Sequence, residues 1–237
     1  MGRDCCGWDV EGIYPMLEDD HTWLLAADAL LAHDTGVLSA TTAFGKTVVS
    51  AYLIGQHKVN TLILVHSSAL LEQWKDAMER FLNIEEPLPE QPKKRGRKKR
   101  LERIGQIGAG KRSRSGIIDI AIMQSLFEGE EKDVKPFDAE YGMGLCDECH
   151  HMAALTFEKI LRAVKAKYVY GLSATPVLQD GHQPIIFMQC GRVCYLVDAK
   201  SQADKRSFDY YVIPRFTRTR LPATRKIQDA YAGIIKE

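Results

Sequence analysis

The segment at residues 37–47 constrains the fold most, because it reads V-L-S-A-T-T-A-F-G-K-T and is followed by a helix-compatible run at residues 48–54. An apolar run, a loop of small residues and a helix, in that order, are typical of a phosphate-binding loop, where backbone amides and a helix N-terminus face an anion. Lys46 is expected to supply positive charge to the phosphates, and the Thr47 hydroxyl to ligate Mg²⁺. The pattern predicts a nucleotide-binding loop made of Thr41, Thr42, Ala43, Phe44, Gly45, Lys46 and Thr47.

A second motif, Asp147-Glu148, follows a weakly apolar run at residues 141–146 that is expected to form a strand. At the carboxyl end of a strand beside the loop, Asp147 can hold Mg²⁺ through its water shell, and Glu148 can accept the proton of an attacking water molecule. We therefore predict catalytic roles for Lys46, Asp147 and Glu148. Thr47 and Asp147 are the predicted metal ligands. The ~100 residues between the motifs leave room for several strand–helix units, which predicts an α/β fold with a parallel sheet and helices on both faces.

Length and composition fit a catalytic domain. The 237 residues would form one large domain or a domain with a tail. The hydrophobic share of 45% is enough for a core, and the net charge of +1 favours no class of partner. No apolar run approaches the ~18 residues of a membrane span, and the N-terminus lacks the apolar core of a signal peptide. The six scattered cysteines are interpreted as reduced thiols, so we expect a cytoplasmic protein without a membrane partner.

Three motifs, in order along the chain, carry a resemblance to one protein family. Residues 147–150 read D-E-C-H, a DExH box, and residues 173–175 read S-A-T, which resembles helicase motif III. Ala40 stands at a loop position where this family often has alanine. Together these motifs make residues ~20–215 resemble the first RecA-like lobe of superfamily-2 DExH-box helicases and translocases. The stretch 171–181 is similar to the motor subunits of restriction enzymes.

The resemblance implies a P-loop NTPase that binds ATP and Mg²⁺ and hydrolyses ATP. His150 would join the ATP-binding residues, and Ser173 and Thr175 would couple the nucleotide site to nucleic acid. Residues 66–74 are similar to helicase motif Ia, and residues 124–126 to a segment near the nucleic-acid path. The implied nucleic-acid contacts are His66, Gln73, Gln124 and Ser125.

The same resemblance implies partners and a domain organisation. Nucleic acid is expected, with DNA favoured, together with a nuclease or methylase subunit. Residues 17–200 would form the ATP-binding lobe, with a basic insertion at residues 85–115, between an N-terminal segment at 1–16 and a tail at 201–237. A second RecA-like lobe is not expected within the 237 residues. Hydrolysis by the isolated lobe should therefore be weak, because an arginine supplied from outside can be worth ~10³–10⁵ in rate.

Hydrophobic periodicity predicts the remaining elements. Residues 60–66 form a continuous apolar run that suits a buried parallel strand, and a helix with Ser67 or Ser68 as its N-cap follows. Trp74 would lie on the inner face of that helix, where we expect it to pack in the core. Further helices are expected at residues 17–33, 152–165 and 223–237, and further strands at residues 104–107, 116–123, 168–170, 185–188, 193–197 and 210–213.

Other interpretations remain open. The basic block at residues 93–100 could bind nucleic-acid phosphates, so a lobe that binds nucleic acid without nucleotide is the main alternative. A P-loop enzyme acting on small molecules is another. Residues 146–150 read C-D-E-C-H, which also matches haem attachment or, with Cys190 and Cys194, a zinc site. We favour Cys146 as a small apolar residue inside the sheet.

Overall fold

The computed structural model describes residues 8–9, 22–41, 44–85, 102–128, 133–134, 141–149, 154–174 and 183–197. The chain divides into two compact units, Met1–Ala203 and Asp204–Glu237, and all the described residues belong to the first. None of the helices within these ranges is long and apolar enough to cross a membrane.

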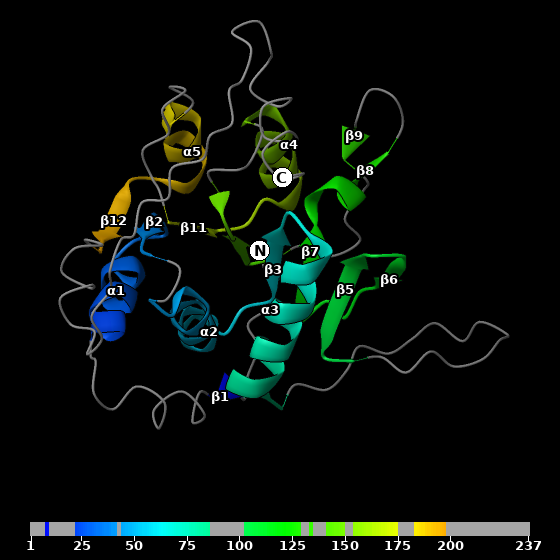
Figure 1. The fold of residues 1–237 in the computed structure, drawn as a ribbon, viewed down its shortest axis with the longest axis horizontal. Coiled ribbons are helices and arrows are strands. Elements are labelled where there is room, and N and C mark those ends of the chain that lie inside the picture. The colour runs from blue at the N-terminus through cyan, green and yellow to red at the C-terminus, as the bar shows by residue number, and fades with distance from the viewer. Residues whose placement is uncertain are drawn as a thin grey trace, which may run out of the picture. The chain divides into compact units, whose positions relative to one another are not determined.

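The centre of the first unit is an eight-stranded sheet with the strand order β12-β2-β11-β10-β3-β7-β5-β6 (Figure 1). Neighbouring strands run parallel, except for the edge pair of β5 and β6, which is antiparallel. The strands are β2 Thr35–Ser39, β3 Thr61–Val65, β5 Ile104–Gly108, β6 Lys111–Ser113, β7 Ile118–Ile122, β10 Met143–Cys146, β11 Tyr168–Ser173 and β12 Val193–Leu196. This mostly parallel sheet confirms the predicted α/β fold.

Helices cover both faces of the sheet (Figure 1). The helices on one face are α1 Thr22–Leu31, α2 Lys46–His57 and α3 Ser68–Phe81, and those on the other are α4 Ala154–Val164 and α5 Gln183–Cys190. Side chains alternate along a strand, and in β3 Ile63 and Val65 join the core beneath α1–α3, whereas Leu62 and Leu64 join the core beneath α4 and α5. A strand buried on both faces needs the continuous apolar run that the sequence shows.

The helix predicted after β3 is confirmed in detail. Its N-cap is Ser67, whose hydroxyl accepts a hydrogen bond from the Leu70 amide at 3.3 Å. The residues of its inner face are Leu71, Trp74, Met78 and Phe81, which are all buried. This N-cap fixes where the helix begins, so it also fixes which side chains of α3 face the sheet.

The strand predicted at residues 185–188 is wrong, because this segment lies in α5. A run of four apolar residues has no periodicity that separates a strand from a helix. The topology supplies the reason for the helix. Because β11 and β12 both pair in parallel with β2, the chain between them must cross over one face of the sheet. Crossovers of this kind usually contain a helix.

The insertion predicted at residues 85–115 overlaps the central sheet. The strand expected at residues 104–107 is present as β5, which pairs in parallel with β7 and is buried throughout. A turn at Ala109 and Gly110, both with positive φ, leads into β6. Residues 104–113 therefore extend the sheet at its edge, and the strand predicted at residues 104–107 is part of it.

The remaining predicted elements are present where the structure describes them. The helix expected at residues 17–33 begins at Thr22, and the one expected at 152–165 is α4. The expected strands include β7, which is followed by the short 3-10 helix η2 Met123–Leu126. Two pairings of two-residue strands complete the description of these ranges, namely β1 Trp8–Asp9 with β4 Asn83–Ile84, and β8 Phe127–Glu128 with β9 Asp133–Val134. Residues 210–213 and 223–237 lie outside the described ranges.

Candidate functional site

Three segments that the sequence marks as functional follow three adjacent strands. β2 leads into the loop before α2, β10 leads into Asp147-Glu148, and β11 ends at Ser173. The strand order β2-β11-β10 is parallel throughout, so the carboxyl ends of these strands lie side by side. Open α/β sheets bind their ligands at this edge.

The loop between β2 and α2 ends in a glycine with a left-handed backbone. Gly45 has φ 91° and ψ 32°, a conformation that residues with a Cβ rarely adopt. The Gly45 carbonyl accepts hydrogen bonds from the amides of Val48 at 2.9 Å and Val49 at 3.1 Å, which start α2. The amides that precede them in the first turn need partners from outside the helix, and the turn therefore presents N–H groups to the loop region.

Of the other predicted loop residues, the structure describes Thr41, Phe44, Lys46 and Thr47. Phe44 is buried, and its amide donates to the Thr41 carbonyl at 3.1 Å. Thr41 and Thr47 are half-buried. Thr42 and Ala43 lie outside the described residues.

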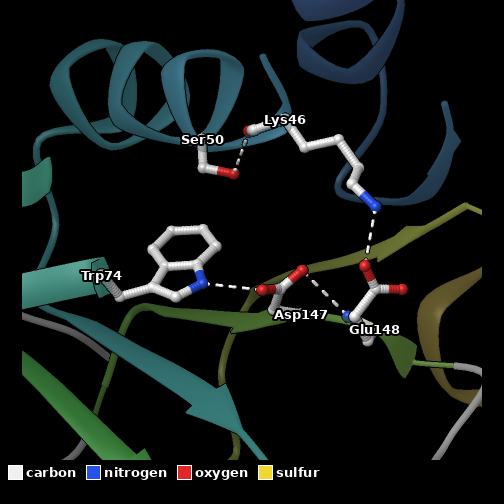
Figure 2. A network of polar contacts seen from close by, with 5 residues as sticks. All are labelled: Lys46, Ser50, Trp74, Asp147 and Glu148. Atoms are coloured by element: carbon white, nitrogen blue, oxygen red, sulfur yellow. Dashed lines mark hydrogen bonds and ion pairs between the residues drawn. The ribbon is translucent and has the colours of Figure 1, made fainter. Parts of the chain in front are cut away.

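Lys46 extends to the acidic pair (Figure 2). Its Nζ donates to Glu148 Oε1 at 3.0 Å, although 102 residues separate the two in sequence. The side chains are 7% and 20% exposed, so the ion pair is largely shielded from water. A charge in such surroundings is costly to leave without a partner, and Lys46 can leave Glu148 readily only for another anion.

The backbone of Glu148 is itself unusual. Its φ is 47°, in the left-handed region that few residues other than glycine adopt. Strained backbone of this kind is frequent at functional sites, where the surrounding structure holds it. The turn directs Glu148 towards Lys46, while Asp147 before it points towards α3 (Figure 2).

Asp147 is 7% exposed and is held through both carboxylate oxygens. Oδ2 accepts a hydrogen bond from Trp74 Nε1 at 2.7 Å, and Oδ1 accepts one from the Glu148 amide at 2.9 Å. Burial raises the pKa of the Asp147 carboxyl above its usual value, and the charge of Glu148 raises it further. The hydrogen bond from Trp74 and the charge of Lys46 act in the opposite direction but do not cancel this rise. A bound cation would favour the charged carboxylate.

Trp74 is the member of this site that the sequence did not assign. We expected it to pack in the core, and its side chain is 1% exposed, but its indole N–H also contacts Asp147 directly. A tryptophan that is expected to be buried usually has a hydrogen-bond acceptor for its indole N–H, so the sequence could have indicated that one exists. The sequence does not show which acceptor that is.

Ser173, the last residue of β11, contacts the start of the predicted phosphate-binding loop. It is 1% exposed, and its carbonyl accepts a hydrogen bond from the Ala40 amide at 2.9 Å. A backbone hydrogen bond therefore joins the residue after β2 to the last residue of β11. Two further predicted site residues, His150 and Thr175, lie outside the described residues.

The residues predicted to contact nucleic acid follow the neighbouring strands. His66, half-buried, comes directly after β3, and Gln73 is exposed on α3. Gln124 is exposed and Ser125 half-buried in η2, directly after β7. Because β3 and β7 run parallel to β10, His66 and η2 lie along the same edge of the sheet as Asp147.

The cysteines near the box are free thiols in the described part of the chain. Cys146 lies in β10 and is buried, as expected for a small apolar residue. Cys149 and Cys190 are also buried, and a Cβ added at Gly171 would lie 3.2 Å from the sulfur of each. Burial raises the pKa of all three thiols, that of Cys149 to about 12. The described residues contain no group of three His, Cys, Asp or Glu side chains placed to hold a metal ion.

Comparison with known proteins gives consistent matches. The family described as the type III restriction enzyme, res subunit, matches residues 22–178. The DNA 3'-5' translocase XPB2 of Sulfurisphaera tokodaii is 24% identical over 212 residues, covering 90% of this chain and 42% of that protein. Among solved structures, the UvsW helicase from bacteriophage T4 has a TM-score of 0.55 at 17% identity, covering 82% of this chain and 69% of that chain.

A further solved structure, the Hef helicase domain of Pyrococcus furiosus, has a TM-score of 0.53 at 17% identity, covering 77% of this chain and 38% of that chain. These structural likenesses confirm the predicted RecA-like fold. The chain spans less than half the length of XPB2.

Proposed function

The chain belongs to the family of the type III restriction enzyme res subunit, and from this we propose that it is the first motor lobe of a helicase or translocase, which binds and hydrolyses ATP. The ion pair between Lys46 and Glu148 is the observation that supports this most strongly. It joins the phosphate-binding loop to the acidic box, the two segments that ATP hydrolysis requires in one place.

The residues at this edge suit ATP and Mg²⁺. Gly45 and the first turn of α2 can hold phosphate oxygens, together with the predicted loop residues and His150. The Thr47 hydroxyl and the Asp147 carboxylate are oxygen ligands, which Mg²⁺ prefers, and the shielding of Asp147 strengthens its attraction for a cation. When bound, Mg²⁺ would neutralise charge that develops on the phosphates.

Lys46 and Glu148 would exchange partners when the nucleotide binds. The γ-phosphate offers Lys46 the anion that it needs to leave Glu148. Released from the ion pair, the Glu148 carboxylate can accept the proton of a water molecule directed at the γ-phosphate. Asp147, held by two hydrogen bonds, stays in place while its neighbour turns.

Nucleic acid is the proposed substrate, with DNA favoured because the relative named above is a DNA translocase. His66, Gln73, Gln124 and Ser125 would contact its backbone. Ser173 and Thr175 would couple these contacts to the nucleotide site, and the backbone bond from Ala40 to Ser173 offers a direct path.

A second RecA-like lobe would complete the catalytic site. We propose that it contributes the arginine that stabilises charge on the transferred phosphoryl group, so that hydrolysis by the 237-residue chain is slow. A nuclease or methylase subunit is the proposed further partner. This proposal follows from the family to which the chain belongs.

Calorimetric titration of ATP into the chain, with Mg²⁺ and with EDTA, tests the proposed function. We expect saturable binding of one ATP per chain in Mg²⁺ and much weaker binding in EDTA, since Thr47 and Asp147 contribute only through the cation. Binding to a DNA duplex is measured on the same sample. A chain that binds DNA but shows no heat of binding with ATP and Mg²⁺ contradicts the proposed function.

A further inference from the structure

The contact between Trp74 and Asp147 joins two elements that lie 73 residues apart in sequence. Trp74 is on α3, the helix that also carries Gln73, and Asp147 is the first residue after β10. The indole Nε1 donates to Asp147 Oδ2 at 2.7 Å, a short hydrogen bond for an N–H donor (Figure 2). Hydrogen bonds to a charged acceptor are short in this way and are about twice as strong as neutral ones.

The geometry determines the orientation of the carboxylate. With Trp74 on Oδ2 and the Glu148 amide on Oδ1, both oxygens are anchored from different sides. The carboxylate plane can then rotate only if one of the two hydrogen bonds breaks. Each oxygen keeps lone pairs for a further donor, such as a water molecule of a hydrated cation.

A second buried tryptophan shows that the fold does not need such a contact for packing alone. Trp23 on α1 is 4% exposed and packs edge-to-face on Tyr52, with ring centroids 5.5 Å apart. Its Nε1 finds no hydrogen-bond partner among the residues that the structure describes. Trp23 and Trp74 belong to the same hydrophobic core, so they differ chiefly in what their indole N–H contacts.

We propose that Trp74 is a positioning residue for the metal site: its indole N–H holds the Asp147 carboxylate in the orientation that receives the water shell of Mg²⁺. This inference rests on the proposed function, because Mg²⁺ enters only with the nucleotide. Trp74 does not touch substrate or metal, and it acts through Asp147. Residues that orient metal ligands in this way commonly account for 10–100-fold in metal affinity or activity.

Trp74→Phe tests the inference, with Trp23→Phe as the matched control. Both substitutions keep an aromatic ring in the same core and remove one indole N–H, but only the first removes a donor to Asp147. At fixed ATP, Trp74→Phe should raise the Mg²⁺ concentration for half-maximal nucleotide binding by about 10-fold. Trp23→Phe should leave it unchanged, and ATP affinity in EDTA should be the same for both variants.

A double-variant cycle isolates the contact itself. In an Asp147→Ala background, Trp74→Phe should have no further effect on the Mg²⁺ dependence, because the two side chains act as one unit. Urea unfolding of the single variants separates a change in stability from a change in the metal site. Equal Mg²⁺ dependence for Trp74→Phe and Trp23→Phe overturns the inference.

Nuclear magnetic resonance of ¹⁵N-labelled tryptophan gives a readout that needs no nucleotide. The Trp74 indole N–H signal is the one that Trp74→Phe removes. It should lie downfield in the wild-type chain and move upfield in Asp147→Ala, while the Trp23 signal should stay in place. If that signal does not respond to Asp147→Ala, the contact is absent and the inference fails. If it responds but the wild-type chain does not bind ATP with Mg²⁺, the proposed function fails while the contact stands.

Discussion

Glu148→Gln is expected to lower ATP hydrolysis by about 10²–10⁴-fold while ATP affinity in Mg²⁺ stays within a few-fold of the wild type. Glutamine keeps the size and shape of the side chain but cannot accept the proton of the attacking water. The substitution also removes the ion pair of Glu148 with Lys46, which leaves Lys46 available to the phosphates. Phosphate release at saturating ATP measures the first quantity, and calorimetric titration measures the second.

Glu102→Gln is a matched control for this experiment. Glu102 accepts a hydrogen bond from Lys75 Nζ at 2.6 Å, so the substitution also breaks a pair between a lysine and a glutamate. This pair is exposed and includes neither residue of the acidic box. Phosphate release should be unchanged by Glu102→Gln. If Glu148→Gln hydrolysed ATP at the wild-type rate, Glu148 would not be the base.

Lys46→Ala is expected to abolish ATP binding at the concentrations that saturate the wild type, a loss of at least about 100-fold. Lys46 is 7% exposed, so its charge acts on the phosphates with little screening by water. Its removal also leaves the Glu148 carboxylate facing the place where the γ-phosphate would lie, and like charges repel. Calorimetric titration with ATP and Mg²⁺ measures the loss.

Lys75→Ala provides the control, because it removes a lysine that is paired with Glu102 and belongs to neither the loop nor the acidic box. Its ATP affinity should match that of the wild type. Urea unfolding of both variants is needed, since the loss of the ion pair from a half-buried carboxylate also lowers the free energy of unfolding. If Lys46→Ala bound ATP with wild-type affinity, the assignment of the phosphate-binding loop would be contradicted.

The sequence is enough to predict that the loop and the acidic box lie close together. Each segment follows an apolar run of strand length, and the carboxyl ends of parallel strands lie at one edge of a sheet. The contact of Lys46 with Glu148 is the outcome that this rule leads to. The rule does not give the strand order, which is why it places the two segments near each other without giving their distance.

The contact of Trp74 with Asp147 could not be predicted in the same way. The periodicity of α3 places Trp74 on the inner face, and the structure confirms that part. Its acceptor depends on how α3 packs over the sheet and on the pairing of Met143 with Thr61 and Cys146 with Leu64, which fixes where β10 ends. Both depend on long-range packing, which local patterns do not contain.

The helix α5 shows a different limit of the sequence. Residues 185–188 are apolar without interruption, so local pattern favours a strand as readily as a helix. The parallel pairing of β12 with β2 requires a crossover, and this requirement is visible only once the strand order is known. In β3, by contrast, residues 62–65 are apolar because both faces are buried, and the sequence predicts this strand correctly.

Anomalous X-ray scattering from Mn²⁺, in crystals grown with a non-hydrolysable ATP analogue, tests directly whether the loop and the box share one metal ion. We predict a single Mn²⁺ peak at the nucleotide, between the Thr47 hydroxyl and the Asp147 carboxylate, with Lys46 Nζ moved from Glu148 to the γ-phosphate. A bound analogue whose Mn²⁺ peak lies away from Asp147, or a nucleotide bound elsewhere on the chain, would contradict the assignment of this edge of the sheet as the site of an ATP-driven motor.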